Sequence, residues 1–261
     1  MTVPACVVTF LGTSAAVPSI SRDTTSLCLT EPKAAILVDC GGSPAHKLRR
    51  LGVDPLRLTA VVITHTHPDH AYGLPSLVQS LILLGRTWPL PIYCREEHTE
   101  TLRALLDLFR LFNRGCPVEI IGVKAREGER LFVTEEFIVT ASPNAHGGMP
   151  NLAIRVDAPA LGRAAVYSSD TEPTDAVIRL ARGVHTLIHE ATFPHSERAR
   201  AQGHSTARQA GEVAEAAGVS RLILTHIDWG LCAGAEAVIA EAQTAFGGEV
   251  LVAEELHPYP L

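Results

Sequence analysis

The sequence predicts an α/β fold with many strands, and three observations lead to it. Short apolar runs rich in β-branched residues, such as Thr59–Ile63, recur along the chain and are typical of buried strands. Segments with apolar residues at helical spacing alternate with these runs, and the contents of 46% hydrophobic and 19% charged residues are those of a globular protein. At 261 residues, the chain is expected to form one large domain, residues 1–261.

The first part of the chain begins with strands and then alternates strands and helices. We expect strands at Val7–Leu11, Ser26–Thr30, Ala35–Asp39, Thr59–Ile63, Pro91–Cys94 and Val118–Val123. We expect helices at Pro44–Leu51, Ala71–Leu84 and Glu96–Phe112. The last helix is strongly apolar, which predicts either burial or a contact with a second copy of the chain in a homodimer.

The second part resembles the first in its order of elements, although no repeat is visible in the sequence. We expect strands at Arg130–Thr134, Phe137–Ser142, Leu152–Val156, Ala164–Ser168, Thr186–His189, Arg221–Thr225 and Glu249–Val252. We expect helices at Thr174–Arg182, after Thr206 and at Gly234–Phe246. Thr206 and Gln209 have the spacing of a capping box, which fixes the start of the helix that follows them.

Composition excludes several classes of protein. The start, Met1–Pro4, has no basic segment followed by an apolar one, and no apolar run approaches the roughly 18–20 residues that span a bilayer. The six cysteines are scattered without CxxC pairs, which favours small buried residues in a reduced compartment. We therefore expect a cytoplasmic protein without membrane spans. The formal net charge of −6 argues against broad, sequence-independent binding of nucleic acid.

A cluster of histidines follows the buried run Thr59–Ile63. The stretch Thr64-His65-Thr66-His67-Pro68-Asp69-His70 places three imidazoles and a carboxylate in a turn between a strand and a helix. His65 and His67 are two residues apart in an extended segment, so their rings face the same way. Such a set suits one or two transition-metal ions far better than a protein core or a plain surface loop.

Three further candidate ligands occur later in the chain. His146, Asp170 and His226 are each the first strong ligand after an apolar run. Sites built on sheets place their chemistry at such strand ends. Each residue alone would more often be structural, so they become candidates for a metal site only together with the cluster at 65–70.

The spacing His-x-His-x-Asp-His resembles the signature of the metallo-β-lactamase superfamily, and the later candidates follow in that superfamily's order. The resemblance implies an αββα four-layer sandwich, in which two mixed β-sheets are flanked by helices. It also implies two divalent metal ions: one held by His65, His67 and His146, the other by Asp69, His70 and His226, with Asp170 bridging. Mixed imidazole and carboxylate ligands suit Zn²⁺, with Mn²⁺ or Fe as alternatives.

Two further segments are similar to the tRNase Z-like branch of that superfamily. They are Ile188-His189-Glu190-Ala191-Thr192-Phe193 and Gly203-His204-Ser205-Thr206-Ala207. The resemblance implies that His204 protonates the leaving oxygen and that Glu190 orients it. Cleavage of a phosphodiester expels an alkoxide, which an acid assists, and a carboxylate partner raises the pKa of a histidine toward neutrality. Asp69 is a further candidate as the group that accepts a proton from the attacking water.

The chain also departs from the branch. Ser169 stands where the family usually has Gly, and Glu172 where it often has Arg. Only residues 147–169 separate His146 from Asp170, which leaves no room for the long arm that grips tRNA in many tRNase Z proteins. These departures reduce the case for tRNA as the substrate and leave the predicted metal chemistry unchanged.

The sequence therefore predicts a dinuclear metal-dependent phosphodiesterase, related to ribonuclease Z, in which a metal-activated hydroxide attacks the phosphorus. The substrate would be a small or cyclic phosphodiester or an RNA 3′ end. One alternative is hydrolysis of a carboxyl ester, thioester or sulfate ester, as in other branches. A second alternative, from a different class, is a metal-dependent binding protein without catalysis.

Overall fold

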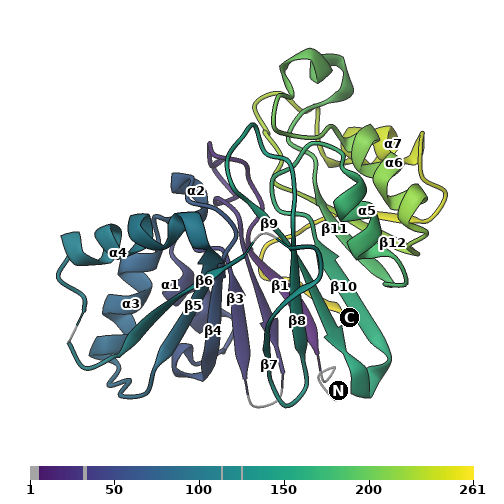
Figure 1. Ribbon diagram of the computed structural model, residues 1–261. Helices are drawn as coiled ribbons and strands as arrows, with labels where there is room; N and C mark the ends of the chain where they lie inside the picture. Colours follow the sequence, from purple (N-terminus) through teal and green to yellow (C-terminus); the bar gives the residue numbers. More distant parts are fainter. Residues whose placement is uncertain (1–5, 32–33, 113, 125) are drawn as a thin grey trace. The chain divides into compact units, whose positions relative to one another are not determined.

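The computed structural model describes residues 6–31, 34–112, 114–124 and 126–261 (Figure 1). The segment Met1–Pro4, on which the expectation of no targeting signal rests, lies outside the described residues. The chain divides into two compact units. The first unit comprises Met1–Gly12, Arg22–Lys124 and Glu254–Pro260, and the second Thr13–Ser21, Ala125–Ala253 and Leu261. That the two units form one domain stays a prediction.

The first unit is built on a mixed sheet of seven strands. In spatial order these are β14 (Pro258–Pro260), β1 (Val7–Gly12), β2 (Ser26–Thr30), β3 (Ala35–Val38), β4 (Leu58–Ile63), β5 (Leu90–Arg95) and β6 (Val118–Val123). The strands from β14 to β3 pair antiparallel and those from β3 to β6 pair parallel. Its longer helices are α1 (Pro44–Arg50), α3 (Leu74–Leu83) and α4 (Thr99–Leu108). They share one buried apolar cluster with the sheet, which includes Leu48, Leu77 and Leu106.

The second unit repeats this plan with another mixed sheet of seven strands. In spatial order these are β7 (Glu129–Val133), β8 (Ile138–Pro143), β9 (Leu152–Ala158), β10 (Arg163–Tyr167), β11 (Thr186–Glu190), β12 (Arg221–Thr225) and β13 (Glu249–Val252). The strands from β7 to β10 pair antiparallel and those from β10 to β13 pair parallel. Its helices are α5 (Asp175–Ala181), α6 (Ala207–Ala217) and α7 (Ala235–Gln243), which bury Val177, Val213 and Val238 against the sheet.

The prediction of two mixed sheets with flanking helices is therefore confirmed. Apart from β14, which comes last in the chain, the antiparallel strands of each unit precede its parallel strands in the sequence, and this accounts for the similar order of elements in the two parts. Parallel strands end at one common edge of their sheet, and loops at that edge can bring side chains from several strands together. The candidate ligands follow β4 in the first unit, and β8, β10 and β12 in the second.

Two predicted helices are interrupted. The helix expected over Ala71–Leu84 is instead α2 (Pro68–Ala71) followed by α3. Gly73 lies between them because its backbone N–H donates to the carbonyl of Cys40 at 2.8 Å, and a Cβ would stand 2.5 Å from that oxygen. The helix expected over Glu96–Phe112 is a 3₁₀ turn followed by α4, and Arg110 adopts a left-handed φ of 52° just after α4 ends.

One strand was not predicted from the sequence. β14 contains two prolines in three residues, a composition that argues against a strand because proline has no backbone donor. It nevertheless pairs with β1, through Tyr259 opposite Val8, and forms the edge of its sheet. Proline is tolerated on an edge strand because one side of the strand needs no partner.

Smaller expectations can also be compared with the structure. The capping box at Thr206 and Gln209 is present at the start of α6. The cysteines are free thiols, and burial raises the pKa of both Cys28 and Cys94 to about 12, which keeps these thiols unreactive. Within the described part of the chain, no helix is both long enough and apolar enough to cross a bilayer. A cytoplasmic location stays a prediction.

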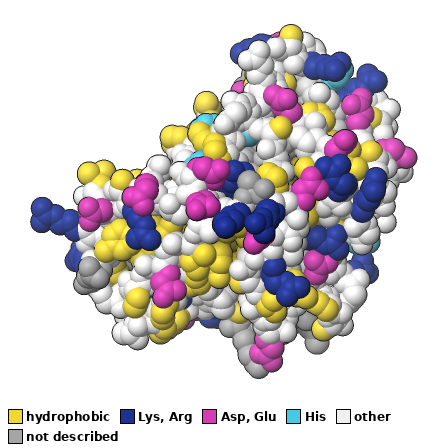
Figure 2. Space-filling view, in the orientation of Figure 1, with side chains coloured by type: hydrophobic (Ala, Val, Ile, Leu, Met, Phe, Trp, Pro, Cys, Tyr) yellow, Lys and Arg dark blue, Asp and Glu magenta, His cyan; other side chains and the backbone are white. Residues whose placement is uncertain are grey.

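The apolar helix α4 is only partly buried. Leu102 and Leu106 are fully buried in the first unit, whereas Leu108 is 74% and Phe109 is 56% exposed. Figure 2 shows hydrophobic side chains on the surface of the part of the chain that contains α3 and α4. The contact with a second copy of the chain stays a prediction.

Candidate functional site

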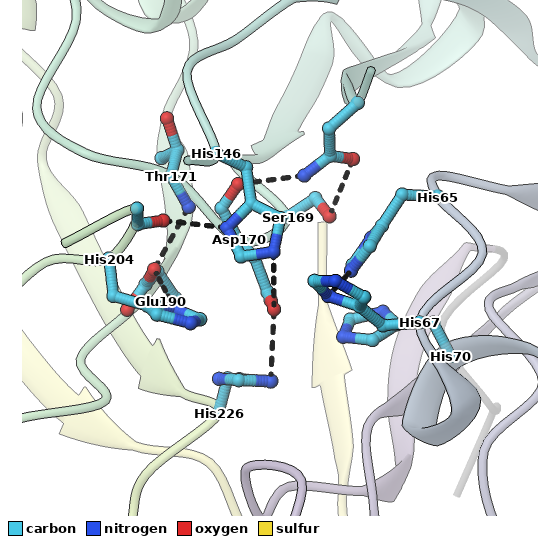
Figure 3. Close-up of polar contacts among 12 residues, drawn as sticks. His65, His67, His70, His146, Ser169, Asp170, Thr171, Glu190, His204 and His226 are labelled. Atoms are coloured by element: carbon cyan, nitrogen blue, oxygen red, sulfur yellow. Dashed lines mark hydrogen bonds and ion pairs between the residues drawn. The ribbon is translucent and has the colours of Figure 1, made fainter. Parts of the chain in front are cut away.

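The histidine cluster of the first unit lies where the sequence predicts it. β4 ends at Ile63 and α2 begins at Pro68, so the motif forms the turn between them. His65 Nε2 and His67 Nδ1 are 3.0 Å apart, and the ring centroids of His65 and His70 are 4.1 Å apart. Asp69 Oδ2 lies 3.5 Å from His70 Nε2. The four side chains therefore converge on one small region, and the three histidines are drawn together in Figure 3.

Asp39, which the sequence analysis did not select, organises this cluster. It follows β3, is fully buried, and adopts a left-handed φ of 60°. One carboxylate oxygen accepts from the backbone N–H of Thr64 at 2.8 Å, and the other lies 2.8 Å from His70 Nδ1. A buried carboxylate makes Nδ1 the protonated nitrogen of His70 and leaves Nε2 as an acceptor, as is usual for metal-binding histidines.

The second unit brings His146, Asp170 and His226 together. Asp170 Oδ2 lies 3.9 Å from His146 Nε2 and 3.2 Å from His226 Nε2 (Figure 3). The Nδ1 of His146 lies 2.7 Å from the carbonyl oxygen of Gly203, and the Nδ1 of His226 lies 2.8 Å from the hydroxyl of Thr192. Both histidines thus resemble metal ligands, which engage one ring nitrogen with the protein and keep the other for the metal.

The backbone before Asp170 is held in an unusual conformation. Ser169 has a φ of 52°, in the left-handed region that glycine favours, and this is where the related family usually has Gly. The amide of Asn151 donates to the carbonyl of Asp170 at 2.7 Å and accepts from the hydroxyl of Ser169 at 3.2 Å. Asn144 donates to the carbonyl of Ser168 at 2.6 Å. These side-chain contacts fix the turn that presents the Asp170 carboxylate.

Glu190 and His204 form the pair that the sequence predicts. His204 Nδ1 lies 2.9 Å from Glu190 Oε1, and Glu190 is fully buried while His204 is partly exposed. The same carboxylate accepts from the backbone N–H of Thr171 at 2.9 Å and from the hydroxyl of Thr192 at 2.7 Å. Burial raises the pKa of Glu190, but the charge and hydrogen bond of His204, together with His226, outweigh it, and the net effect lowers that pKa and favours the carboxylate form.

His204 also lies against the candidate ligands of its own unit. Its ring stacks on His226 with centroids 5.6 Å apart and meets His146 edge-on with centroids 4.8 Å apart. Ligand-type atoms of Glu190, His204 and His226 lie within 4.8 Å of one another, which is close enough for a metal ion. The Glu190 oxygens are already occupied by hydrogen bonds, however, so this carboxylate fits the partner of an acid better than a metal ligand.

The structure thus places every predicted site residue in one of two groups. The first unit holds His65, His67, Asp69 and His70, and the second holds His146, Asp170, Glu190, His204 and His226. That the two groups share metal ions stays a prediction. Sequence reasoning missed Asp39, Thr192 and Asn151, because each acts on another side chain and none is part of a ligand motif. Two of them gave a signal: Asp39 ends the apolar run of β3, and Thr192 lies in the segment 188–193 that is similar to the tRNase Z-like branch.

Comparison with known proteins identifies a family and several relatives of this chain. Residues 34–227 match the family model described as the beta-lactamase superfamily domain. A ribonuclease Z from Methanothermobacter thermautotrophicus is 33% identical over an alignment of 267 positions, which covers 84% of this chain and 86% of that protein.

Two solved structures are similar over nearly the whole chain. The metallo-β-lactamase fold protein YhfI from Bacillus subtilis has a TM-score of 0.83 at 24% identity, and the match covers 98% of this chain and 99% of the YhfI chain. The short form of human tRNase Z has a TM-score of 0.80 at 26% identity, and the match covers 97% of this chain and 98% of the human chain. The predicted metallo-β-lactamase fold is therefore confirmed.

Proposed function

The chain belongs to the metallo-β-lactamase superfamily and is ribonuclease Z-like, and on this premise we propose that it hydrolyses phosphodiester bonds with two bound metal ions. The observation that carries the proposal is the buried, ionised Glu190 held against His204. Hydrolysis of an ester with a good leaving group needs no such acid, whereas a phosphodiester that releases an alkoxide benefits from one.

The metal ligands are proposed to come from both units. His65, His67 and His146 would hold one ion and Asp69, His70 and His226 the other, while Asp170 would contact both. In support, the Nδ1 atoms of His70, His146 and His226 all have partners in the protein, which leaves each Nε2 for a metal. Two divalent ions held there, Zn²⁺ in preference to Mn²⁺ or Fe, would acidify a water molecule and neutralise charge on the phosphoryl oxygens.

The protein's own residues account for the proton transfers. Glu190 keeps the His204 proton on Nδ1, so a second proton on Nε2 is the one available to the substrate. As the water oxygen bonds to phosphorus and the leaving oxygen departs, His204 Nε2 would give its proton to that leaving oxygen. Asp69 is the proposed acceptor for the proton lost by the water.

The substrate is proposed to be a small or cyclic phosphodiester or an RNA 3′ end. The ribonuclease Z relatives support RNA. Against a tRNA substrate, the residues between His146 and Asp170 are used for β9, a short 3₁₀ turn and β10, with no inserted arm.

The proposal can be tested with the metal-loaded protein and two phosphodiesters that differ in leaving group. Asp69→Ala should abolish turnover of bis(p-nitrophenyl) phosphate. His204→Ala should lower kcat by about 10²–10⁴-fold on a phosphodiester that releases an alkoxide, and by much less when p-nitrophenolate leaves. The matched controls Asp107→Ala and His46→Ala, both at exposed positions, should retain wild-type rates.

Other outcomes would replace the proposal. Wild-type turnover in both Asp69→Ala and His204→Ala would refute it. A protein that binds two metals and hydrolyses a thioester or a sulfate ester but no phosphodiester would assign it to that alternative class, with His204 as a structural residue. A precursor tRNA with a 3′ extension, compared with a 2′,3′-cyclic nucleotide, separates the two proposed kinds of substrate.

A further inference from the structure

Thr192 occupies a central position among the functional side chains of the second unit. It is 4% exposed and lies two residues beyond Glu190, after the end of β11. Its hydroxyl oxygen is 2.7 Å from Glu190 Oε2, 2.8 Å from His226 Nδ1 and 3.3 Å from His204 Nδ1. One hydroxyl therefore contacts both members of the proposed acid pair and a proposed metal ligand.

The hydrogens in this group can be assigned from chemistry. A threonine hydroxyl has one hydrogen to donate and two lone pairs that accept. Glu190 accepts a backbone N–H on each oxygen, from Thr171 and from Thr192, as a carboxylate does. Its Oε2 lies 2.7 Å from the Thr192 hydroxyl, nearer than the carbonyl oxygen of His226 at 3.0 Å, so the Thr192 hydrogen points to Glu190 Oε2. The hydroxyl then accepts from His226, which places the imidazole hydrogen on Nδ1 and leaves a lone pair on Nε2. That Nε2 lies 3.2 Å from Asp170 Oδ2, on the side of the other candidate ligand.

The backbone holds Thr192 in place independently of its hydroxyl. The backbone N–H of Thr192 donates to Glu190 Oε2 at 3.1 Å, and its carbonyl accepts from the N–H of Asp228 at 3.1 Å. In the preceding residue, the N–H of Ala191 donates to the carbonyl of Thr225 at 2.9 Å. Replacing the hydroxyl with a methyl group of similar size should therefore leave the loop in position.

We propose that Thr192 is a positioning residue that joins the acid pair to the metal ligand. Its hydroxyl fixes His226 as the tautomer that can bind a metal through Nε2, and it holds Glu190 Oε2 so that Oε1 remains on His204. The inference rests on the proposed function for its effect on turnover, but not for its effect on metal binding. The Thr192 hydroxyl oxygen thereby determines both the tautomer of His226 and the position of the Glu190 carboxylate against His204.

Three variants test this assignment. Thr192→Val removes the hydroxyl and keeps the shape, Thr192→Ser keeps the hydroxyl, and Thr225→Val serves as the matched control. The Thr225 hydroxyl is buried beside His226, at the end of β12, and has no hydrogen-bond partner among the residues that the structure describes. Its removal should therefore change neither metal binding nor turnover.

The first readout is Zn²⁺ affinity, measured by competition with a chromophoric chelator. Thr192→Val should weaken one of the two binding steps by about 10- to 100-fold, as loss of a partner to a metal-binding histidine does. It should also lower kcat on a phosphodiester more than it raises KM, because the acid pair acts during bond cleavage. Thr192→Ser should restore both quantities to within a few-fold of wild type, which a role in packing alone would not predict.

Specific results would overturn the inference. Wild-type Zn²⁺ affinity in Thr192→Val, or failure of Thr192→Ser to restore it, would show that the hydroxyl does not position His226. If wild type binds Zn²⁺ but cleaves no phosphodiester, the proposed function fails while the affinity measurement still tests Thr192. If Thr192→Val does not fold, nitrogen NMR of the Zn²⁺-loaded wild type decides: His226 should keep its hydrogen on Nδ1 and bind the metal through Nε2, and metal binding through Nδ1 would refute the assignment.

Discussion

Replacing Asp39 by asparagine should weaken metal binding without unfolding the first unit. The variant keeps the size of the side chain, and asparagine tolerates the left-handed φ of 60° found at this position better than most residues. What changes is the second oxygen of the carboxylate. In wild type one oxygen accepts from Thr64 and the other faces His70 Nδ1 at 2.8 Å.

The size of the effect follows from hydrogen-bond chemistry. An amide has one oxygen that accepts and one nitrogen that only donates. If the oxygen of Asn at position 39 accepts from Thr64, its nitrogen faces His70 Nδ1, and the imidazole hydrogen moves to Nε2. A metal ion then competes with that hydrogen, which we expect to lower affinity by about 10- to 100-fold. This factor corresponds to about 1.4–2.8 kcal/mol of binding free energy.

The assay is Zn²⁺ competition with a chromophoric chelator, together with thermal unfolding of the metal-free protein. Asp54→Asn is the matched control, because Asp54 is an exposed carboxylate of the same unit that caps a 3₁₀ turn by accepting from Leu56 N. The control should bind Zn²⁺ as wild type does. Equal affinity in Asp39→Asn and wild type would refute the reasoning that Asp39 sets the tautomer of His70.

Three further changes have defined outcomes. Gly41→Ala should reduce Zn²⁺ affinity, because the new Cβ would stand 2.3 Å from the carbonyl oxygen of Asp69 and displace the motif; unchanged affinity would contradict this. Gly218→Ala should lower the free energy of unfolding by about 1 kcal/mol, since Gly218 ends α6 at a φ of 70° in open space, whereas Gly247→Ala, without positive φ, should not. Burial lowers the pKa of His189 below its usual 6.5, so the unfolded chain takes up a proton first as pH falls. The free energy of unfolding of the metal-free protein should therefore decline below about pH 6.5, and this group contributes up to ~1.4 kcal/mol per pH unit. Urea titrations at two pH values should show a smaller decline in the free energy of unfolding for His189→Met than for wild type.

Local signals in the sequence were enough to place most elements. β2, β6, β12 and β13 begin and end at the predicted residues, because each is a short apolar run bounded by polar or turn residues. The errors arose where a distant contact decides the backbone. Gly73 interrupts a helical pattern because it packs against Cys40, and β14 forms despite its prolines because β1 offers an unpaired edge.

For the candidate site too, the sequence accounts for some features and only the tertiary structure for others. The sequence by itself identified the candidate ligands, because His and Asp at several strand ends match the ligand order of the metallo-β-lactamase superfamily. What only the tertiary structure decided is which ring nitrogen of His70 and of His226 has a protein partner. Asp39 faces His70 and Thr192 faces His226, and neither partner is adjacent in sequence to the residue that it orients. Folding brings these partners together, and a tautomer depends on the hydrogen bond at the other nitrogen, which no sequence motif records.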